Sequence, residues 1–96
     1  MLILKPNCES CGTDLPPNST DAMICSYECT FCRRCAEVLL HNICPNCGGG
    51  FQARPIRPED GLQEHPASTE PIEPGVDQEK HLAFLRRFRG VPPERR

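Results

Sequence analysis

The residues of this chain with the most distinctive chemistry are its eight cysteines. They form four pairs with two or three residues between the members: Cys8 and Cys11, Cys25 and Cys29, Cys32 and Cys35, Cys44 and Cys47. This spacing lets both thiolates of a pair turn toward one ion, as a tetrahedral zinc site requires. Four pairs therefore predict two closed four-cysteine sites, with two Zn²⁺ ions per chain. Iron is the alternative metal for such sites.

The residues that follow two of the pairs support metal binding. Gly12 and Gly48 stand directly after the second cysteine, where the chain must turn sharply, often at positive φ, which glycine adopts cheaply. Backbone N–H groups in such turns can donate to the thiolates. A redox Cys-x-x-Cys motif would need a thioredoxin-like βαβ context, which the sequence does not show.

The rest of the chain indicates why metal would be needed. Its 96 residues include eleven prolines, seven glycines and no tryptophan. A chain this poor in large apolar side chains cannot bury the core of a self-sufficient enzyme. Two structural zinc ions, contributing about 10–16 kcal/mol each, would supply the missing stability. We therefore expect residues 1–50 to be unfolded without metal.

Composition divides the chain into three segments. Residues 1–50 hold all eight cysteines and most large aliphatic side chains, and form the predicted double zinc-binding domain. Residues 51–76 are acidic, contain five prolines and lack periodic apolar positions, which predicts an extended linker. Residues 77–96 regain apolar residues and carry six of the eleven Lys and Arg residues.

The third segment predicts a basic amphipathic helix over residues 77–89. Asp77 is a suitable N-cap, and Gly90 is placed to end the helix. At about 100° per residue, four apolar side chains fall on one face. They are Leu82, Phe84, Leu85 and Phe88. This face would pack on the chain's own small core, on a second copy, or in a groove of a protein partner.

The spacing leaves three ways to distribute the four pairs between two metals: sequential, nested and interleaved. Cys29-Thr30-Phe31-Cys32-Arg33-Arg34-Cys35 and Cys44-Pro45-Asn46-Cys47 resemble the central and closing ligands of a RING finger. A sequential LIM-type arrangement ranks second, because its loops are usually longer. The RING resemblance implies a small zinc-stabilised α+β fold with a short β-hairpin and one short helix between Ala36 and Ile43.

The RING resemblance also implies an interleaved cross-brace. Site 1 would consist of Cys8, Cys11, Cys32 and Cys35, and site 2 of Cys25, Cys29, Cys44 and Cys47. The contact surface of RING ubiquitin ligases is missing, however. Those ligases carry an aliphatic residue between the first two ligands and often a tryptophan between the sixth and seventh. Here Glu9 and Ser10 occupy the first place, and the chain has no tryptophan. The scaffold alone does not carry the function.

A closer resemblance extends over the chain and includes residues between the ligands. Pro6-Asn7-Cys8, Asp14-Leu15-Pro16-Pro17 and the run from Ile24 to Cys32 are similar to the bacterial domain-of-unknown-function family 1272. The resemblance implies a bacterial, cytosolic origin and metal binding, and it implies no reaction.

The remaining features bound the function. The chain shows no Ser/His/Asp set, phosphate loop or paired carboxylates at a recognisable spacing, and a four-cysteine site lacks the open position of a catalytic zinc. The acidic charge of residues 1–50, which two zinc–thiolate sites would make more negative, weighs against nucleic acid, and no run approaches the ~20 apolar residues of a membrane span. His41, three residues before Cys44, is expected at the surface.

Together these observations predict a cytoplasmic, non-catalytic zinc-binding module that acts as a protein–protein adaptor. Three alternatives remain open. The first is a RING-type ligase-like adaptor for a transfer enzyme, disfavoured by the missing contact residues. The second is nucleic-acid binding through the Arg-rich tail. The third is zinc buffering or redox sensing.

Overall fold

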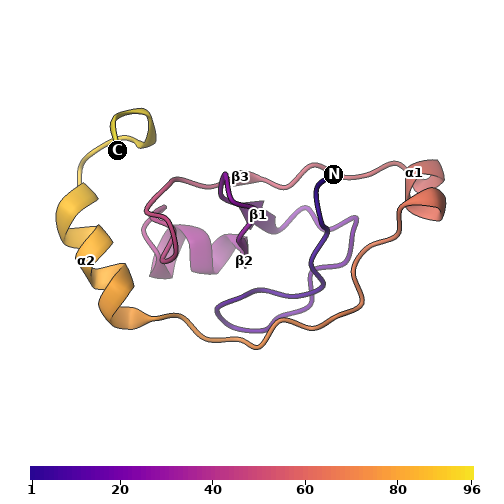
Figure 1. The fold of residues 1–96 in the computed structure, drawn as a ribbon, viewed down its shortest axis with the longest axis horizontal. Helices are drawn as coiled ribbons and strands as arrows, with labels where there is room; N and C mark the ends of the chain where they lie inside the picture. The colour runs from indigo at the N-terminus through magenta and orange to yellow at the C-terminus, as the bar shows by residue number, and fades with distance from the viewer.

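The sheet that organises the N-terminal half is built from very short strands. The computed structural model describes all residues from 1 to 96. Strand β1 (Ala22–Ile24) pairs antiparallel with β2 (Thr30–Cys32), with Met23 opposite Phe31. Strand β3 (Gln52–Ala53) adds to the other edge of β1, so the order is β2-β1-β3 (Figure 1). The sequence predicted the hairpin but not the third strand, because two residues are too few for a period-two pattern.

The helical elements are also short. Element η1 (Cys35–Leu39) is a π-helical turn, closed by a 2.8 Å hydrogen bond from the Leu40 N–H to the Cys35 carbonyl. It lies where the sequence predicted one short helix. Helix α1 (Glu59–Glu64) and the 3-10 turn η2 (Pro93–Arg95) were not predicted. The structure is thus a small α+β fold in which irregular loops carry most of the chain.

Cysteines make up much of the core. Six of the thirteen residues in the buried cluster are cysteines. Within the cluster, the rings of Phe31 and Phe51 lie with their centroids 5.3 Å apart in an edge-to-face arrangement. Leu15, Met23 and Leu40 complete the cluster around these rings. A core in which nearly half the residues are thiols has little apolar surface of its own with which to hold the fold.

Residues 51–76 are not a free linker, since both ends are tied to the cysteine-rich segment. Phe51 lies in the core, and the buried Arg54 guanidinium donates to the carbonyls of Lys5, Leu15 and Pro16. Burial lowers the pKa of Arg54, but the guanidinium stays charged because its reference pKa is so high. One side chain therefore joins three backbone positions that are distant from it in sequence.

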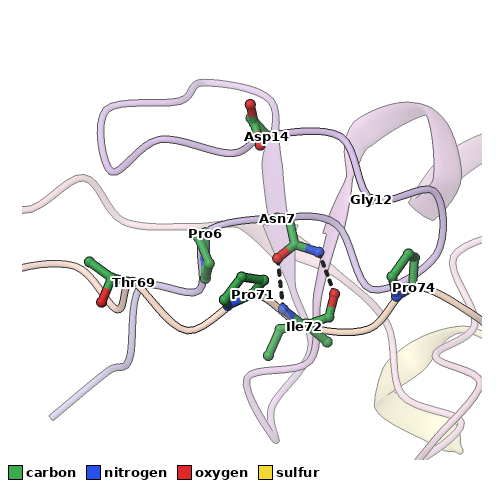
Figure 2. Close-up of a pocket in the computed structure, with 8 residues that line it drawn as sticks. All are labelled: Pro6, Asn7, Gly12, Asp14, Thr69, Pro71, Ile72 and Pro74. Carbon is green, nitrogen blue, oxygen red and sulfur yellow. Dashed lines mark hydrogen bonds between the residues drawn. The ribbon is translucent and has the colours of Figure 1, made fainter.

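The second half of this segment has no helix or strand and lies alongside the N-terminal residues. The Asn7 side-chain amide donates to the Ile72 carbonyl at 2.9 Å, and its oxygen accepts from the Ile72 N–H at 2.8 Å (Figure 2). The Ser68 N–H donates to the Leu4 carbonyl, and the Gly75 N–H donates to that of Glu9. These bonds hold residues 68–75 beside residues 4–9.

Helix α2 (Gln78–Phe88) lies within the range predicted for it. The Asp77 carboxylate caps it by accepting from the Lys80 N–H at 3.1 Å, and Gly90 follows it with a φ of +76°. Figure 1 shows α2 at the end of the molecule opposite α1. None of the helices has the length and apolar character needed to cross a membrane.

Candidate metal centres

One group of cysteines brings four sulfurs together. The Sγ atoms of Cys8, Cys11, Cys32 and Cys35, here called the four-sulfur cluster, all lie within 4.8 Å of one another. The Cys11 and Cys32 sulfurs are 3.8 Å apart, far beyond the ~2.05 Å of a disulfide bond. A tetrahedral ion with Zn–S bonds of about 2.3 Å places its ligands about 3.8 Å apart. The sulfur separation therefore fits a shared ion.

The four-sulfur cluster is positioned by a tight turn and by the end of the hairpin. The Cys8 N–H donates to Thr13 and the Gly12 N–H donates back to Cys8, which closes the turn. Gly12 adopts a φ of +79°, the left-handed conformation predicted from its place after the second cysteine. Cys32 is the last residue of β2 and Cys35 is the first residue of η1, so the sheet and the π-helical turn each contribute one sulfur.

A second group brings three sulfurs together. The Sγ atoms of Cys25, Cys44 and Cys47, here called the three-sulfur cluster, lie within 4.8 Å of one another. Cys25 directly follows β1, whereas Cys44 and Cys47 lie on an irregular loop that turns at Gly48, where φ is +79°. The structure thus groups the first cysteine pair with the third, and one member of the second pair with the fourth.

Cys29, the remaining predicted ligand of this second site, lies outside the three-sulfur cluster. Its sulfur accepts a hydrogen bond from the side-chain amide of Asn46 at 3.4 Å. Sequence reasoning did not identify Asn46 as a functional residue. Its position between the two cysteines of a Cys-x-x-Cys pair could have indicated such a role, because a polar side chain there can reach the neighbouring sulfurs.

Backbone N–H groups point at the sulfurs in both clusters, as the sequence predicted. Ser10 and Cys11 donate to Cys8 at 3.4 and 3.5 Å. In the other cluster, Tyr27 donates to Cys25 at 3.3 Å, Asn46 to Cys44 at 3.4 Å, and Gly49 to Cys47 at 3.4 Å. Such donors stabilise thiolate charge and orient the ligands of a metal.

Burial makes several of these thiols harder to ionise. Burial raises the pKa of Cys35 to about 12 and raises the pKa values of Cys29, Cys32 and Cys44 as well. Burial acts in the same direction on Cys8, but backbone N–H donors outweigh it and lower the pKa of that thiol. A divalent ion bound here would favour the thiolates and displace their protons.

The histidines do not join either cluster. His41, close to Cys44 in sequence, is exposed, as predicted, and adopts a φ of +54°. His81 is buried, with a ring nitrogen 3.0 Å from the Leu40 carbonyl oxygen. Seven of the eight cysteines are therefore the residues that the structure offers to soft metal ions in these two places.

Comparison with known proteins places the chain in a family. A family model described as "Protein of unknown function (DUF1272)" matches residues 1–57, which include both cysteine clusters and β3. An uncharacterised protein of Rhizobium meliloti is 61% identical over 69 residues, which are 72% of this chain and 82% of that relative. No solved structure matches the chain. As the residues between its cysteines predicted, the chain belongs to the DUF1272 family.

Proposed function

We propose that this protein is a non-catalytic zinc-binding module with two closed four-cysteine sites in a RING-like cross-brace. Cys8, Cys11, Cys32 and Cys35 would hold one ion; Cys25, Cys44 and Cys47 would hold the other, with Cys29 as its fourth ligand. The observation that carries this proposal is the four-sulfur cluster, whose 3.8 Å sulfur separation fits a tetrahedral ion. The interleaved grouping of pairs supports the cross-brace.

Closed sites favour a structural role for the metal. Four thiolates fill a tetrahedral ion and leave no position for water or substrate, and no carboxylate or histidine belongs to either cluster. The ions would instead hold together a core in which thiols occupy almost half of the positions. Zinc is preferred over iron because a structural role needs no redox chemistry.

Metal analysis combined with native mass spectrometry tests the sites. We expect two zinc ions per chain, one fewer in Cys11→Ser, and one fewer in Cys47→Ser. His41→Ala serves as a control near the ligands and should retain both ions. A purified chain that holds one ion, or that binds iron in preference to zinc when both are supplied, would contradict the proposal.

The finer part of the proposal is that the module acts by contact with other proteins. Supporting it, η1 presents Val38 and Leu39, which are 59% and 50% exposed, next to the buried Cys35. We expect Val38→Asp with Leu39→Asp to abolish binding of proteins captured by the zinc-loaded chain. Ile56→Asp, at another exposed aliphatic position, is the control. The role would be refuted if the double variant still captured these proteins, or if the Ile56→Asp control lost them to the same extent.

The ligase-like alternative is weakened by the surroundings of Glu9. Its carboxylate accepts from the Lys5 ammonium at 3.1 Å and from the Thr30 N–H, so it braces the first cysteine turn against β2. The position that RING ligases use for an aliphatic contact thus has an internal structural role here. A carrier-discharge assay in which the zinc-loaded chain gives no acceleration is the expected result.

A further inference from the structure

We propose that the C-terminal segment, residues 77–96, is a metal-dependent clasp on the three-sulfur cluster. In this inference, docking of the segment and retention of the ion at that cluster strengthen each other, while the four-sulfur cluster is unaffected. The inference rests on the proposed metal-binding function. The segment would then be part of one metal site only, and loss of the ion from that site would release a basic amphipathic helix.

The first support is the contact between α2 and the turn that follows Cys47. A Cβ atom at Gly48 would lie 2.8 Å from Cδ1 of Phe84 and 2.9 Å from Cε2 of Phe88, so both rings rest directly on this backbone. The two rings are stacked, with centroids 6.1 Å apart. Phe84 also borders a pocket with Tyr27, Asn46 and Cys47. The aromatic face of α2 therefore covers the loop that carries two of the predicted ligands.

The second support is that the polar contacts converge on the same loop. Every hydrogen bond between residues 77–96 and the rest of the chain ends on residues 40–48. His81, 6% exposed, has its ring nitrogen 3.0 Å from the Leu40 carbonyl oxygen. The Arg96 guanidinium donates to the carbonyls of Asn42 and Gly48 at 2.9 and 3.2 Å. Both ends of the segment are thus fastened to one short stretch of backbone.

The third support is that this stretch has little structure of its own. Between η1 and β3 no strand or helix forms, and the loop is closed by short hydrogen bonds such as that from the Cys44 N–H to the Gly49 carbonyl. Thiolates of Cys44 and Cys47 held by one ion would fix its shape. Losing the ion would therefore remove the surface on which α2 packs. By thermodynamic linkage, docking of α2 must strengthen ion binding by the same factor by which ion binding strengthens docking.

The consequence of release follows from the composition of the segment. Freed α2 would expose Phe84 and Phe88 beside Arg86, Arg87 and Arg89, which are exposed in the docked helix and form no ion pair. An isolated helix of eleven residues is only marginally stable in water. The released segment would therefore unfold and become open to proteases.

Ion retention in the full-length chain tests the clasp. The chain is loaded with ¹¹³Cd, which gives one NMR resonance per site, and each resonance is followed during competition with EDTA. In the Phe84→Ala, Phe88→Ala double variant we expect the three-sulfur cluster to lose its ion about tenfold faster, with the other site unchanged. Leu82→Ala, at an exposed leucine of the same helix, should behave like the wild type.

The outcomes separate this inference from the proposed function. A wild-type chain that fails to take up two ions refutes the metal-binding proposal. A chain that takes up two ions but whose double variant releases both at wild-type rates, or both faster by the same factor, refutes the clasp alone.

A reciprocal experiment removes the ion and follows the helix. Trypsin cleavage after Arg86 and Arg87 should rise at least tenfold in Cys47→Ser, which disables the three-sulfur cluster. Cys11→Ser, its counterpart in the four-sulfur cluster, should leave α2 protected. Equal protection of α2 in both variants would overturn the inference.

Discussion

The two cysteine clusters share one ligand chemistry but differ in what holds them. The four-sulfur cluster lies between a closed turn and the end of a paired strand, and residues 68–75 tie down the N-terminal residues beside it. The three-sulfur cluster draws two of its sulfurs from a loop without regular structure, which α2 covers. The first cluster is supported by backbone pairing, whereas the second is supported by a distant helix.

The spacing of the cysteines therefore does not determine which elements support them. Each cluster contains one pair with the same spacing and the same following glycine: Cys8 with Cys11 in the first, and Cys44 with Cys47 in the second. Yet the sheet holds one directly, and the other depends on side chains more than thirty residues away in sequence, such as Phe84.

Removal of all metal should have the largest effect and should abolish the contrast. Because six of thirteen core residues are cysteines, we expect exhaustive chelation to unfold residues 1–50, with loss of dispersed amide signals in NMR spectra. Adding zinc back should restore the spectrum. A chelated chain that keeps a dispersed spectrum would show that the apolar core suffices by itself.

Acidification should have the next largest effect and should weaken ion binding at both clusters. Thiols such as Cys35, with a pKa raised to about 12, are protonated at neutral pH without metal, so protons compete with the ion and affinity falls as pH falls. We expect up to about four protons to be released per ion at each cluster, because four thiols are proposed to bind each ion. Calorimetry in buffers of different ionisation enthalpy measures this number. A lower count at the three-sulfur cluster would contradict Cys29 as its fourth ligand.

Substitution of single cysteines tests whether Cys29 binds the ion. Cys44→Ser should remove the ion of the three-sulfur cluster, because it deletes a sulfur inside the group. Cys29→Ser should lower zinc affinity about as much as Cys44→Ser, because Cys29 is proposed as the fourth ligand although its sulfur lies outside the group. Competition with a coloured chelator gives both affinities. A much smaller loss in Cys29→Ser would contradict the proposal that Cys29 binds the ion.

The smallest effect should come from Gly48→Ala in the zinc-loaded chain. Alanine at a φ of +79° costs about 1–2 kcal/mol, and its Cβ must also displace the rings of Phe84 and Phe88, for about 1–3 kcal/mol more. Gly90→Ala is the matched control, since Gly90 has a φ of +76° and open space around it. Thermal unfolding compares the two. Equal destabilisation would show that the ring contact contributes nothing.

Much of the local structure could be predicted from the sequence. The positive φ of Gly12 and Gly48, the cap at Asp77 and the helix beyond it each depend on a few neighbouring residues, which a spacing or a periodicity reveals. The role of residues 51–76 could not be predicted in the same way. Phe51, Arg54 and the backbone of Ile72 contact residues twenty or more positions away, and nothing in their own neighbourhood indicates those partners.

The ligand chemistry of this protein can be read from its residues in order: four closely spaced cysteine pairs in a chain with few large apolar residues. Which pairs meet, that Cys29 stands beside Asn46, and that α2 packs on the loop of Cys44 and Cys47 are features of the folded chain alone. The physical reason is the distance along the chain over which each kind of contact forms. Ligand spacing, turns and caps are set within a few residues, whereas the grouping of sulfurs and the seat of a helix depend on contacts that form only once the whole chain has folded.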